Sequence, residues 1–278
     1  MPASPMIVLL TDFGERDGYV GVMKGVMLGI APGTPLVDLT HEIAPQDVAS
    51  GAWVLHTTWR YFPEGAIFVC VVDPGVGTAR RAVALRIAGR LFLGPDNGLF
   101  SYVLSSGEIE RSVILDNPSF HLPLPSATFH GRDIFAPCAG HLARGVALEA
   151  LGSLIAPSSL TTFPLSRPQW RGDELVAHIA HVDRFGNVIT DLGPEYAGTV
   201  LSTPEATLRL GDHVISQRVR TFAEGPENDL FALRDSTGYV AIVLRNTSAG
   251  GYLGAAVGDE VVVRGLQERV GEIEPTSG

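Results

Sequence analysis

The sequence predicts two domains: an N-terminal α/β domain with a mostly parallel sheet, and a C-terminal all-β domain of barrel or sandwich type. The 278 residues, 45% of them hydrophobic, are more than a typical single domain contains. Apolar strand-like runs alternate with helix-like segments from residue 6 to about residue 150, as in a sheet with helices on both faces. After a proline-rich stretch without periodicity, the runs become β-branched and are separated by Gly, Asn and Asp.

From these changes in pattern we place the α/β domain at residues 1–160, a linker at 161–172 and the β domain at 173–278. The first element, MIVLLTD at residues 6–12, is a short continuous apolar run, which indicates a buried parallel strand. Residues 18–33 carry apolar side chains at helical spacing and end in Pro-Gly, which predicts a helix.

The same signals give the remaining elements. Short apolar runs predict strands, helical spacing ended by Pro or Gly predicts helices, and Ala88-Gly89 between two β-rich runs predicts a hairpin. In chain order we expect a strand at 34–40, a helix at 44–65, a strand at 66–73, a hairpin at 82–95, a helix at 97–107, a strand at 111–117 and a helix at 131–146. In the β domain we expect strands and no helix within the runs 174–192, 206–222, 238–254 and 259–266.

Composition excludes several classes of function. The net charge is −10 and no basic stripe occurs, so we expect no nucleic-acid partner. The N-terminus lacks the pattern of a signal peptide, and no run approaches the roughly 20 apolar residues of a membrane span. We therefore expect a cytoplasmic protein without membrane contact. Cys70 and Cys138 form no Cys-x-x-Cys pair, which argues against a zinc ribbon or a redox motif. Lys24 is the only lysine.

Polar side chains follow the predicted strands at the edge where α/β sheets bind ligands. Asp12 ends the first strand, Asp73 ends the third, and His130 precedes a helix with Arg132 and Asp133. Each also has an ordinary interpretation: a turn former for Asp12, a helix N-cap for Asp133 and a buried, hydrogen-bonded ring for His130. The acids could also bind magnesium, although their spacing matches no recognised metal motif. No P-loop or G-x-G-x-x-G occurs, so we expect no ATP or dinucleotide cofactor.

The stretch VVDPGVGTARRAVAL, residues 71–85, has more polar and flexible residues than a strand end needs. Asp73 ends a buried run, and Pro74, Gly75 and Gly77 let the backbone turn tightly. The chain then returns with Arg80. We interpret Asp73 and Arg80 as facing residues of an active site, and Asp96-Asn97-Gly98 as an ordinary turn.

A set of motifs over residues 6 to about 265 resembles the SAM hydroxide adenosyltransferases, and the motifs are LLTDFGERDGYVGVMKG, HEIAPQDVASGAWVL, YFPEGAIFVCVVDPGVGTARR, GPDNGLF, TFHGRD, HVDRFGNVITD and LRNTSAGGYLG. These enzymes hydrolyse S-adenosyl-L-methionine (SAM) to adenosine and L-methionine, and they are related to bacterial fluorinase and chlorinase. The resemblance implies an N-terminal α/β domain and a C-terminal β-barrel. It also implies a homotrimer with the ligand between the N-domain of one subunit and the C-domain of the next, without metal or other cofactor.

The resemblance also assigns residues. Asp73, Arg80 and His130 match the Asp-Arg-His set that orients and activates water. The matching substrate-binding residues are Asp12 for the ribose hydroxyls, Asp183 and Asn187 for the methionyl ammonium and the adenine, Phe222 for packing on adenine, Ser236 for the methionyl carboxylate, and Arg245 and Thr247 for the adenine edge.

The chemistry of these residues favours water over a halide as nucleophile. Methionine sulfur leaves SAM as a neutral thioether, so no general acid is needed, and the nucleophile must be held in line with the C5′–S bond. The halogenating relatives have hydroxyl-bearing residues around the halide. This sequence has Asp73, Val76 and Gly131 at those places, and a carboxylate suits water rather than a halide. The fluorinase carries an insertion near the position of the run RIAGRLFL. This sequence lacks the insertion, which also favours hydrolysis. Gln46 departs from the tryptophan that relatives have near the ribose.

Two alternatives remain open. Asp12, Asp73 and His130 could be ligands of a metal-dependent hydrolase, or the chain could be a non-catalytic SAM or nucleoside sensor. We interpret Arg81 as structural, because it has a counterpart in the halogenating relatives, and prefer Arg80 for catalysis.

Overall fold

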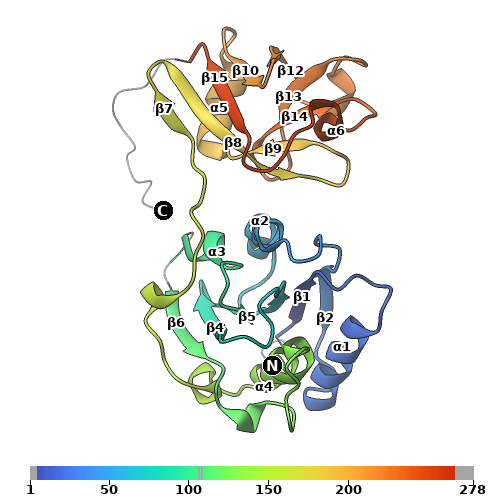
Figure 1. Cartoon of the computed structure of the whole chain (residues 1–278), viewed down its shortest axis with the longest axis vertical. Helices are drawn as coiled ribbons and strands as arrows, with labels where there is room; N and C mark the ends of the chain where they lie inside the picture. The colour runs from blue at the N-terminus through green and yellow to red at the C-terminus, as the bar shows by residue number, and fades with distance from the viewer. Residues whose placement is uncertain (1–4, 106, 108, 267–278) are drawn as a thin grey trace. The chain divides into compact units, whose positions relative to one another are not determined.

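The computed structural model describes residues 5–105, 107 and 109–266, and the chain divides into two compact units, residues 1–164 and 165–278 (Figure 1). The N-terminal unit contains a six-stranded sheet with the strand order β2-β1-β3-β5-β4-β6. Its strands are β1 (Ile7–Thr11), β2 (Leu36–Thr40), β3 (Ile67–Val71), β4 (Ala82–Ile87), β5 (Arg90–Pro95) and β6 (Ile109–Ile114).

The four strands β2, β1, β3 and β5 are parallel, and β4 runs antiparallel to both β5 and β6. This confirms the prediction of a mostly parallel sheet. All residues of β1 and β3 are buried, because helices cover both faces of the sheet and leave no polar side. The predicted hairpin is also confirmed, since Ala88 and Gly89 both have positive φ, as a tight turn between β4 and β5 requires.

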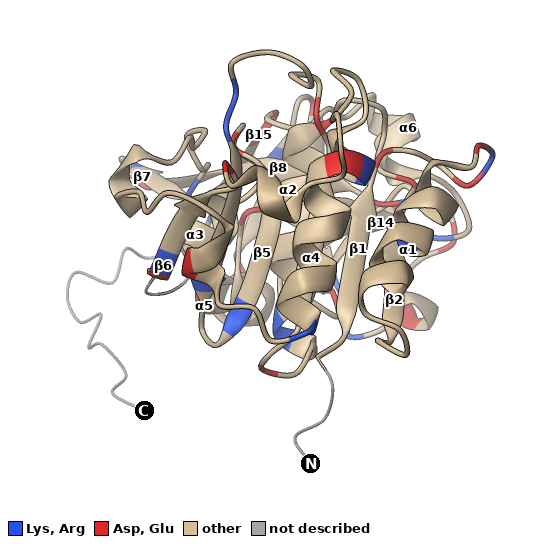
Figure 2. Ribbon diagram, turned by 90° about the horizontal axis from the view of Figure 1, so that it is seen from below, with Lys and Arg blue, Asp and Glu red and all other residues tan. Residues whose placement is uncertain are grey.

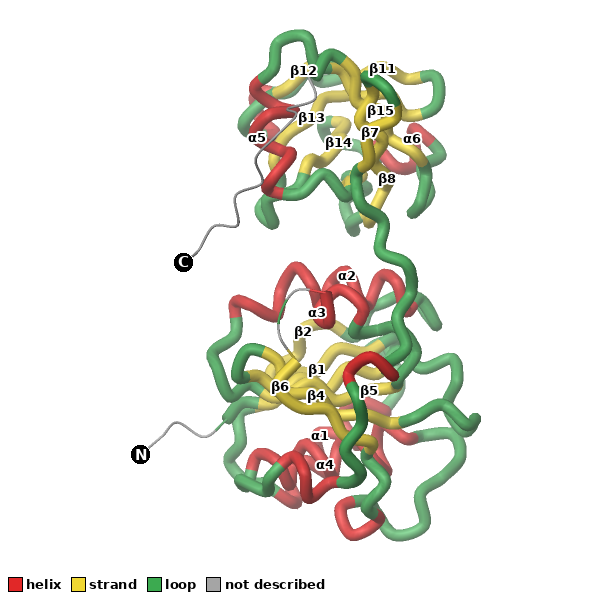
Figure 3. The backbone as a smooth tube through the Cα atoms, turned by 90° about the vertical axis from the view of Figure 1, so that its left-hand side faces the viewer, coloured by secondary structure: helices red, strands yellow, loops and turns green. Residues whose placement is uncertain are grey.

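Figure 3 shows α1 (Tyr19–Ile30) and α4 (Ala136–Ala143) on one face of this sheet, and α2 (Val48–Thr58) and α3 (Ser101–Ser105) on the other. Each face has its own apolar core. Figure 2 shows charged residues mainly in loops, whereas β1 and α4 carry none, as their burial demands. Short helical turns complete the unit at η1 (Trp59–Tyr61), η2 (Pro118–Phe120), η3 (Gly131–Phe135), η4 (Leu148–Leu151) and η5 (Pro157–Ser159).

The C-terminal unit is a nearly closed, barrel-like sheet with the order β11-β10-β15-β8-β9-β14-β13-β12, to which β7 adds by pairing with β8. Among the described strands of this unit, only β12 and β13 pair in parallel. The strands are β7 (Gln169–Arg171), β8 (Glu174–Val182), β9 (Val188–Thr190), β10 (Thr207–Leu210), β11 (His213–Ile215), β12 (Gln217–Arg218), β13 (Leu230–Arg234), β14 (Val240–Leu244) and β15 (Glu260–Arg264).

The expectation of an all-β domain without helices was wrong. This unit contains α5 (Pro194–Ser202) and α6 (Ala249–Leu253), besides the short turn η6 (Phe222–Glu224). Pro194 takes the first helical position of α5, where its missing N–H costs nothing, and Ala197 and Val200 pack into the barrel core. Ser248 caps α6 by accepting from Gly251 N. None of the helices in the described part of the chain is long and apolar enough to cross a membrane.

Candidate active site

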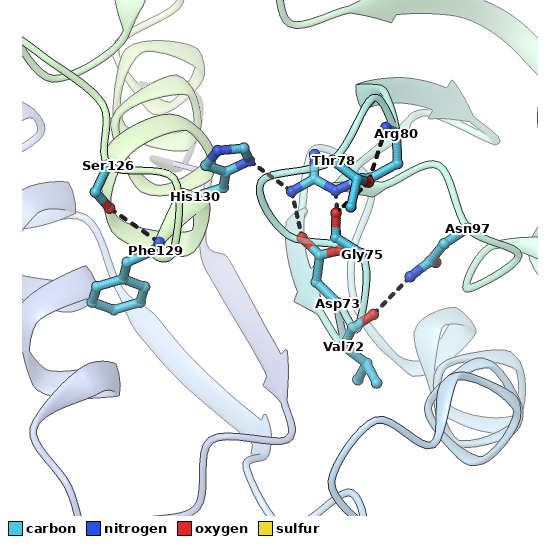
Figure 4. A network of polar contacts seen from close by, with 9 residues as sticks. All are labelled: Val72, Asp73, Gly75, Thr78, Arg80, Asn97, Ser126, Phe129 and His130. Atoms are coloured by element: carbon cyan, nitrogen blue, oxygen red, sulfur yellow. Dashed lines mark hydrogen bonds and ion pairs between the residues drawn. The ribbon is translucent and has the colours of Figure 1, made fainter.

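The turn after β3 is held by its own hydrogen bonds. Asp73 lies two residues beyond the last residue of β3, and its carbonyl accepts from Val76 N over 3.2 Å. The Gly75 carbonyl accepts from Thr78 N at 3.1 Å and from Thr78 Oγ1 at 2.7 Å, and Thr78 Oγ1 accepts from Arg80 N at 3.3 Å (Figure 4). These bonds return the chain so that Arg80 faces Asp73.

Arg80 bridges Asp73 and His130. Its Nε donates to Asp73 Oδ1 over 3.0 Å and its Nη2 donates to Oδ2, so the guanidinium binds both carboxylate oxygens. The two side chains are only 9% and 4% exposed, which shields this ion pair from solvent. The same Nη2 lies 2.7 Å from His130 Nδ1 (Figure 4). The structure therefore brings together the three residues that the resemblance assigns to water activation.

The hydrogen bond from Arg80 determines the tautomer of His130. A guanidinium only donates, so Nδ1 must accept, and the neutral ring carries its proton on Nε2. Burial lowers the pKa of His130, and the positive charge of Arg80 lowers it further, which keeps the ring neutral at pH 7. His130 immediately precedes η3, a π-helical turn, and such turns are frequent at functional sites.

Asp133 holds the loop that leads to His130. Its Oδ2 accepts from Ser126 N over 2.8 Å, and its Oδ1 accepts from Arg132 Nε over 2.6 Å. Ser126 Oγ in turn accepts from Phe129 N at 3.1 Å (Figure 4). Asp133 therefore anchors this loop, which is a positioning role.

Gly77 lets the Asp73 turn pack against the loop before His130. Its φ is +77°, and a Cβ added there would overlap the carbonyl oxygen of Ala127. Glycine is required at this position both for its conformation and for the close approach of two backbones. This contact explains why the sequence has a glycine there.

A Gly77→Ala variant is expected to be less stable than Gly33→Ala by about 1–3 kcal/mol, the cost of forcing atoms into a packed site. Gly33 is the matched control, because its φ is +81° and a Cβ there would meet nothing within 4 Å. Urea unfolding of both variants separates the backbone strain that they share from the overlap at Ala127. Equal stability of the two variants would contradict the packing argument.

Asp12 lies at the same sheet edge as Asp73. Thr11 at the end of β1 pairs with Val71 at the end of β3, so the two carboxylates follow neighbouring strand ends. Asp12 Oδ2 accepts from Gln46 N over 2.8 Å. Gln46, which stands where relatives have a tryptophan, contacts this acid through its backbone and has a φ of 69°.

In the C-terminal unit, Asp183 and Asn187 lie together in the turn between β8 and β9. Asp183 Oδ1 accepts from Phe185 N and Asn187 N, each over 2.9 Å, and Oδ2 accepts from Asn187 Nδ2 over 2.8 Å. The turn packs on the start of α6, where Gly250 N donates to Gly186 O over 2.8 Å. Both carboxylate oxygens of Asp183 therefore accept hydrogen bonds from within its own turn and stabilise that turn.

Arg245 and Thr247 follow β14 at the end where this turn lies, because Val188 of β9 pairs with Ile242 of β14 in antiparallel fashion. Arg245 Nη1 lies 4.0 Å from Glu227 Oε1. The structure therefore brings these two residues to the same end of β14 as Asp183 and Asn187.

Ser236 lies elsewhere in the C-terminal unit, whereas the turn that Phe222 begins is joined to Arg245, whose Nη1 donates to the Gly225 carbonyl over 3.5 Å. Ser236 is exposed in the turn before β14, whereas Asp183 lies near the other end of that strand. A strand of five residues is about 16 Å long, because each residue adds roughly 3.3 Å. Phe222 begins η6 and is 50% exposed. Their neighbours Asp235 and Glu224 line a groove of about 880 Å³ beside α5. The structure does not bring Ser236 together with Asp183, although the resemblance assigns both to the methionyl group.

Arg81 and Asn97 have contacts of a different kind. Arg81 Nε donates to Asp96 Oδ2 over 2.7 Å, and Thr161 N donates to Asp96 Oδ1 over 2.7 Å, so this pair holds the end of the N-terminal unit. Asn97 Nδ2 donates to the Val72 carbonyl over 2.9 Å, directly before Asp73 (Figure 4). Sequence reasoning missed this positioning contact, because GPDNG reads equally well as an ordinary turn.

No group of three or more His, Cys, Asp or Glu residues suited to a metal ion occurs within residues 5–105, 107 and 109–266. Asp12, Asp73 and His130, the metal ligands considered from the sequence, do not form such a group. The described contacts of Asp73 and His130 lead to Arg80 instead.

Comparison with known proteins gives the same family for both units. The chain matches the SAM hydroxide adenosyltransferase N-terminal domain over residues 7–152 and the C-terminal domain of that family over residues 177–262. It is 39% identical over 264 residues to the (R)-S-adenosyl-L-methionine hydrolase of Salinispora arenicola, covering 95% of this chain and 99% of that protein. It is 31% identical over 284 residues to a fluorinase of Actinoplanes sp., covering 91% and 95%.

A crystal structure of a conserved protein from Thermotoga maritima has a TM-score of 0.86 with this chain at 31% identity, covering 93% of this chain and 100% of that one. The family models, the relatives and this fold agree with the resemblance seen in the sequence. This chain therefore belongs to the SAM hydroxide adenosyltransferase family.

Proposed function

We propose that this chain hydrolyses SAM to adenosine and L-methionine by attack of water on the ribose C5′, in line with the C5′–S bond. The observation that carries the proposal is the shielded Asp73–Arg80–His130 cluster at the carboxyl edge of the sheet. Relatives of similar length at 39% identity carry the name of this activity.

The reaction forms an O–C5′ bond and breaks the C5′–S bond, whose electron pair stays on sulfur. Sulfur leaves as a neutral thioether, and the attacking water gives up one proton. The site must therefore orient water and accept a proton, but it need not protonate the leaving group. A carboxylate and a neutral histidine meet this requirement.

The hydrogen bonds favour distinct roles for the three side chains. Arg80 occupies Nδ1 of His130, so the Nε2–H group is left to donate to the water oxygen and orient it. Each Asp73 oxygen receives one hydrogen bond from Arg80 and keeps acceptor capacity for the water proton. Arg80 holds both groups in place. Val76 and Gly131 offer a halide no side-chain donor.

Asp12, with its Oδ2 bound to Gln46 N, is proposed to bind the ribose hydroxyls. The proposed contacts of Asp183, Asn187, Phe222, Arg245 and Thr247 complete the substrate site. Ser236 has the weakest support, because it lies at the other end of β14 from Asp183. One methionyl group of one ligand does not span that strand.

The proposal is tested by incubating the protein with SAM in H₂¹⁸O, with and without EDTA, and analysing the products by chromatography and mass spectrometry. We expect adenosine with ¹⁸O at its 5′-hydroxyl, an equal amount of methionine, and no loss of rate with EDTA. Loss of activity with EDTA would favour a metal-dependent hydrolase. Intact SAM recovered with the protein would favour a sensor, and a 5′-halo-5′-deoxyadenosine formed faster than adenosine would favour halogenation.

We further propose a homotrimer in which each ligand contacts the N-terminal unit of one subunit and the C-terminal unit of its neighbour. The support is the family resemblance and the division of the proposed residues between the two units. Co-refolding Asp73→Ala with Asn187→Ala protein should restore part of the activity, because some sites then carry neither change. Verified mixed trimers without any recovered activity would place each complete site within one chain.

A further inference from the structure

A chain of hydrogen bonds links α1 and β2 to the residue before Asp12. Lys24 Nζ donates to Asp38 Oδ2 over 2.6 Å, and Asp38 Oδ1 lies 3.0 Å from His41 Nε2. His41 Nδ1 lies 2.8 Å from Oγ1 of Thr11, the last residue of β1. Thr11 exposes none of its surface and His41 exposes 3%, so the inner half of this chain is sealed from solvent.

The donors and acceptors set the bond directions for a neutral His41 ring. Lys24 only donates, and burial alone would raise the pKa of Asp38, but the bonds from Lys24 and His41 hold it below its ordinary value. The ionised Asp38 only accepts, so a neutral His41 ring carries its proton on Nε2 and accepts at Nδ1 from the Thr11 hydroxyl. Thr11 Oγ1 accepts in turn from Phe13 N over 3.2 Å. Each of these polar groups therefore has a partner.

The order Asp38–His41–Thr11 is that of a nucleophilic triad, but burial excludes that role. A nucleophile must reach its substrate, and Thr11 exposes no surface. What the chain holds is the turn that carries Asp12. Phe13 N is bound by the Thr11 side chain, and Gly14 N donates to the His41 carbonyl over 2.8 Å. The two residues that follow Asp12 are thus tied, directly or through Thr11, to His41.

We propose that Thr11, Lys24, Asp38 and His41 form a positioning network that aims the Asp12 carboxylate at the ribose hydroxyls. The inference rests on the ribose-binding role of Asp12 under the proposed function. In this network Lys24, the sole lysine of the chain, holds the outer residue Asp38 by an ion pair. Gln46 N also donates to Oδ2 of Asp12 over 2.8 Å, so the carboxylate has a direct contact in addition to the network that holds its backbone.

The test compares nucleosides with and without ribose hydroxyls by titration calorimetry on the full chain. Thr11→Val keeps the side-chain shape and removes the hydroxyl. We expect it to weaken adenosine binding about tenfold, the effect of losing one hydrogen bond between a ribose hydroxyl and the charged Asp12 carboxylate. Binding of 2′,3′-dideoxyadenosine, which lacks both hydroxyls, should change less than about twofold. Thr11→Ser should restore adenosine binding.

Thr190→Val is the matched control. Thr190 also exposes none of its surface, accepts from the backbone N–H two residues on, Leu192 N, over 3.3 Å, and donates to the Val240 carbonyl over 2.8 Å. It lies outside the proposed substrate site and should lose similar stability without selective loss of adenosine binding. Equal weakening of both nucleosides in Thr11→Val, or an adenosine affinity equal to that of Thr190→Val, would overturn the network.

Asp38→Ala provides a second variant if Thr11→Val does not fold, because the Asp38 side chain is 39% exposed. It frees His41 Nε2 and should again weaken adenosine selectively. A wild-type protein that binds both nucleosides equally overturns the network. By contrast, wild-type protein that binds adenosine selectively but forms none from SAM overturns the proposed reaction and leaves the network standing.

Discussion

An Asp73→Asn variant is expected to hydrolyse SAM at least about 100-fold more slowly than the wild type, the scale of a lost proton-handling group. Asparagine keeps the size of the side chain but removes its charge, and its amide NH₂ cannot accept the water proton. It would also place a donor against the guanidinium of Arg80, whose Nε and Nη2 now donate to the two carboxylate oxygens. The measurement is adenosine formed per site under single-turnover conditions.

The chain offers a matched control in Asp96→Asn. Asp73 and Asp96 each have a side chain that is 4% exposed and each pairs with an arginine, Arg80 and Arg81 respectively. Both variants should lose stability, but Asp96→Asn should keep most of its hydrolysis, because Asp96 holds only the end of the N-terminal unit. Similar rates for the two variants would show that Asp73 acts through folding and not through chemistry.

An Arg80→Met variant is expected to lose about 3–5 kcal/mol of stability, the usual cost of removing one partner of a buried ion pair. Little discount for solvent applies, since the two side chains are 9% and 4% exposed. The loss would leave Asp73 uncompensated and His130 Nδ1 without its donor, so hydrolysis should fall as well. Urea unfolding at pH 7 gives the change in stability.

The same variant should raise the pKa of His130. In the wild type, burial and the charge of Arg80 lower this pKa below the ordinary value of 6.5. The unfolded chain therefore binds more protons below pH 6.5, and this histidine removes stability as the pH falls from 6.5 toward its lowered pKa. Arg80→Met removes the positive charge of Arg80 and should therefore reduce the loss of stability at low pH. An NMR titration of the His130 ring measures the shift directly.

Arg81→Met is the control for both measurements. Arg81 neighbours Arg80 in the sequence but pairs with Asp96, and its side chain is 29% exposed. It should cost less stability and leave the titration of His130 unchanged. A His130 pKa that moves equally in both variants would exclude the Arg80 contact as its specific cause.

Local signals were sufficient for much of the fold. Short apolar runs gave the parallel strands, and Ala88-Gly89 gave the hairpin, since both features depend on residues close in sequence. The helices of the C-terminal unit were missed. In α5, only Ala197 and Val200 are buried, too short a pattern to stand out among β-branched runs, and α6 spans just five residues.

The sequence by itself determined which residues stand at the ends of β1 and β3, and that Asp73 and Arg80, seven positions apart, can meet across a turn. Tertiary structure alone decided that Arg80, and not Arg81, reaches His130, which lies 50 positions away. The two arginines are neighbours in the sequence, but Arg80 binds Asp73 and His130, whereas Arg81 binds Asp96. Which arginine faces the histidine depends on the packing of the loop before His130 against the Asp73 turn, where Ala127 meets Gly77, and no local pattern encodes that contact.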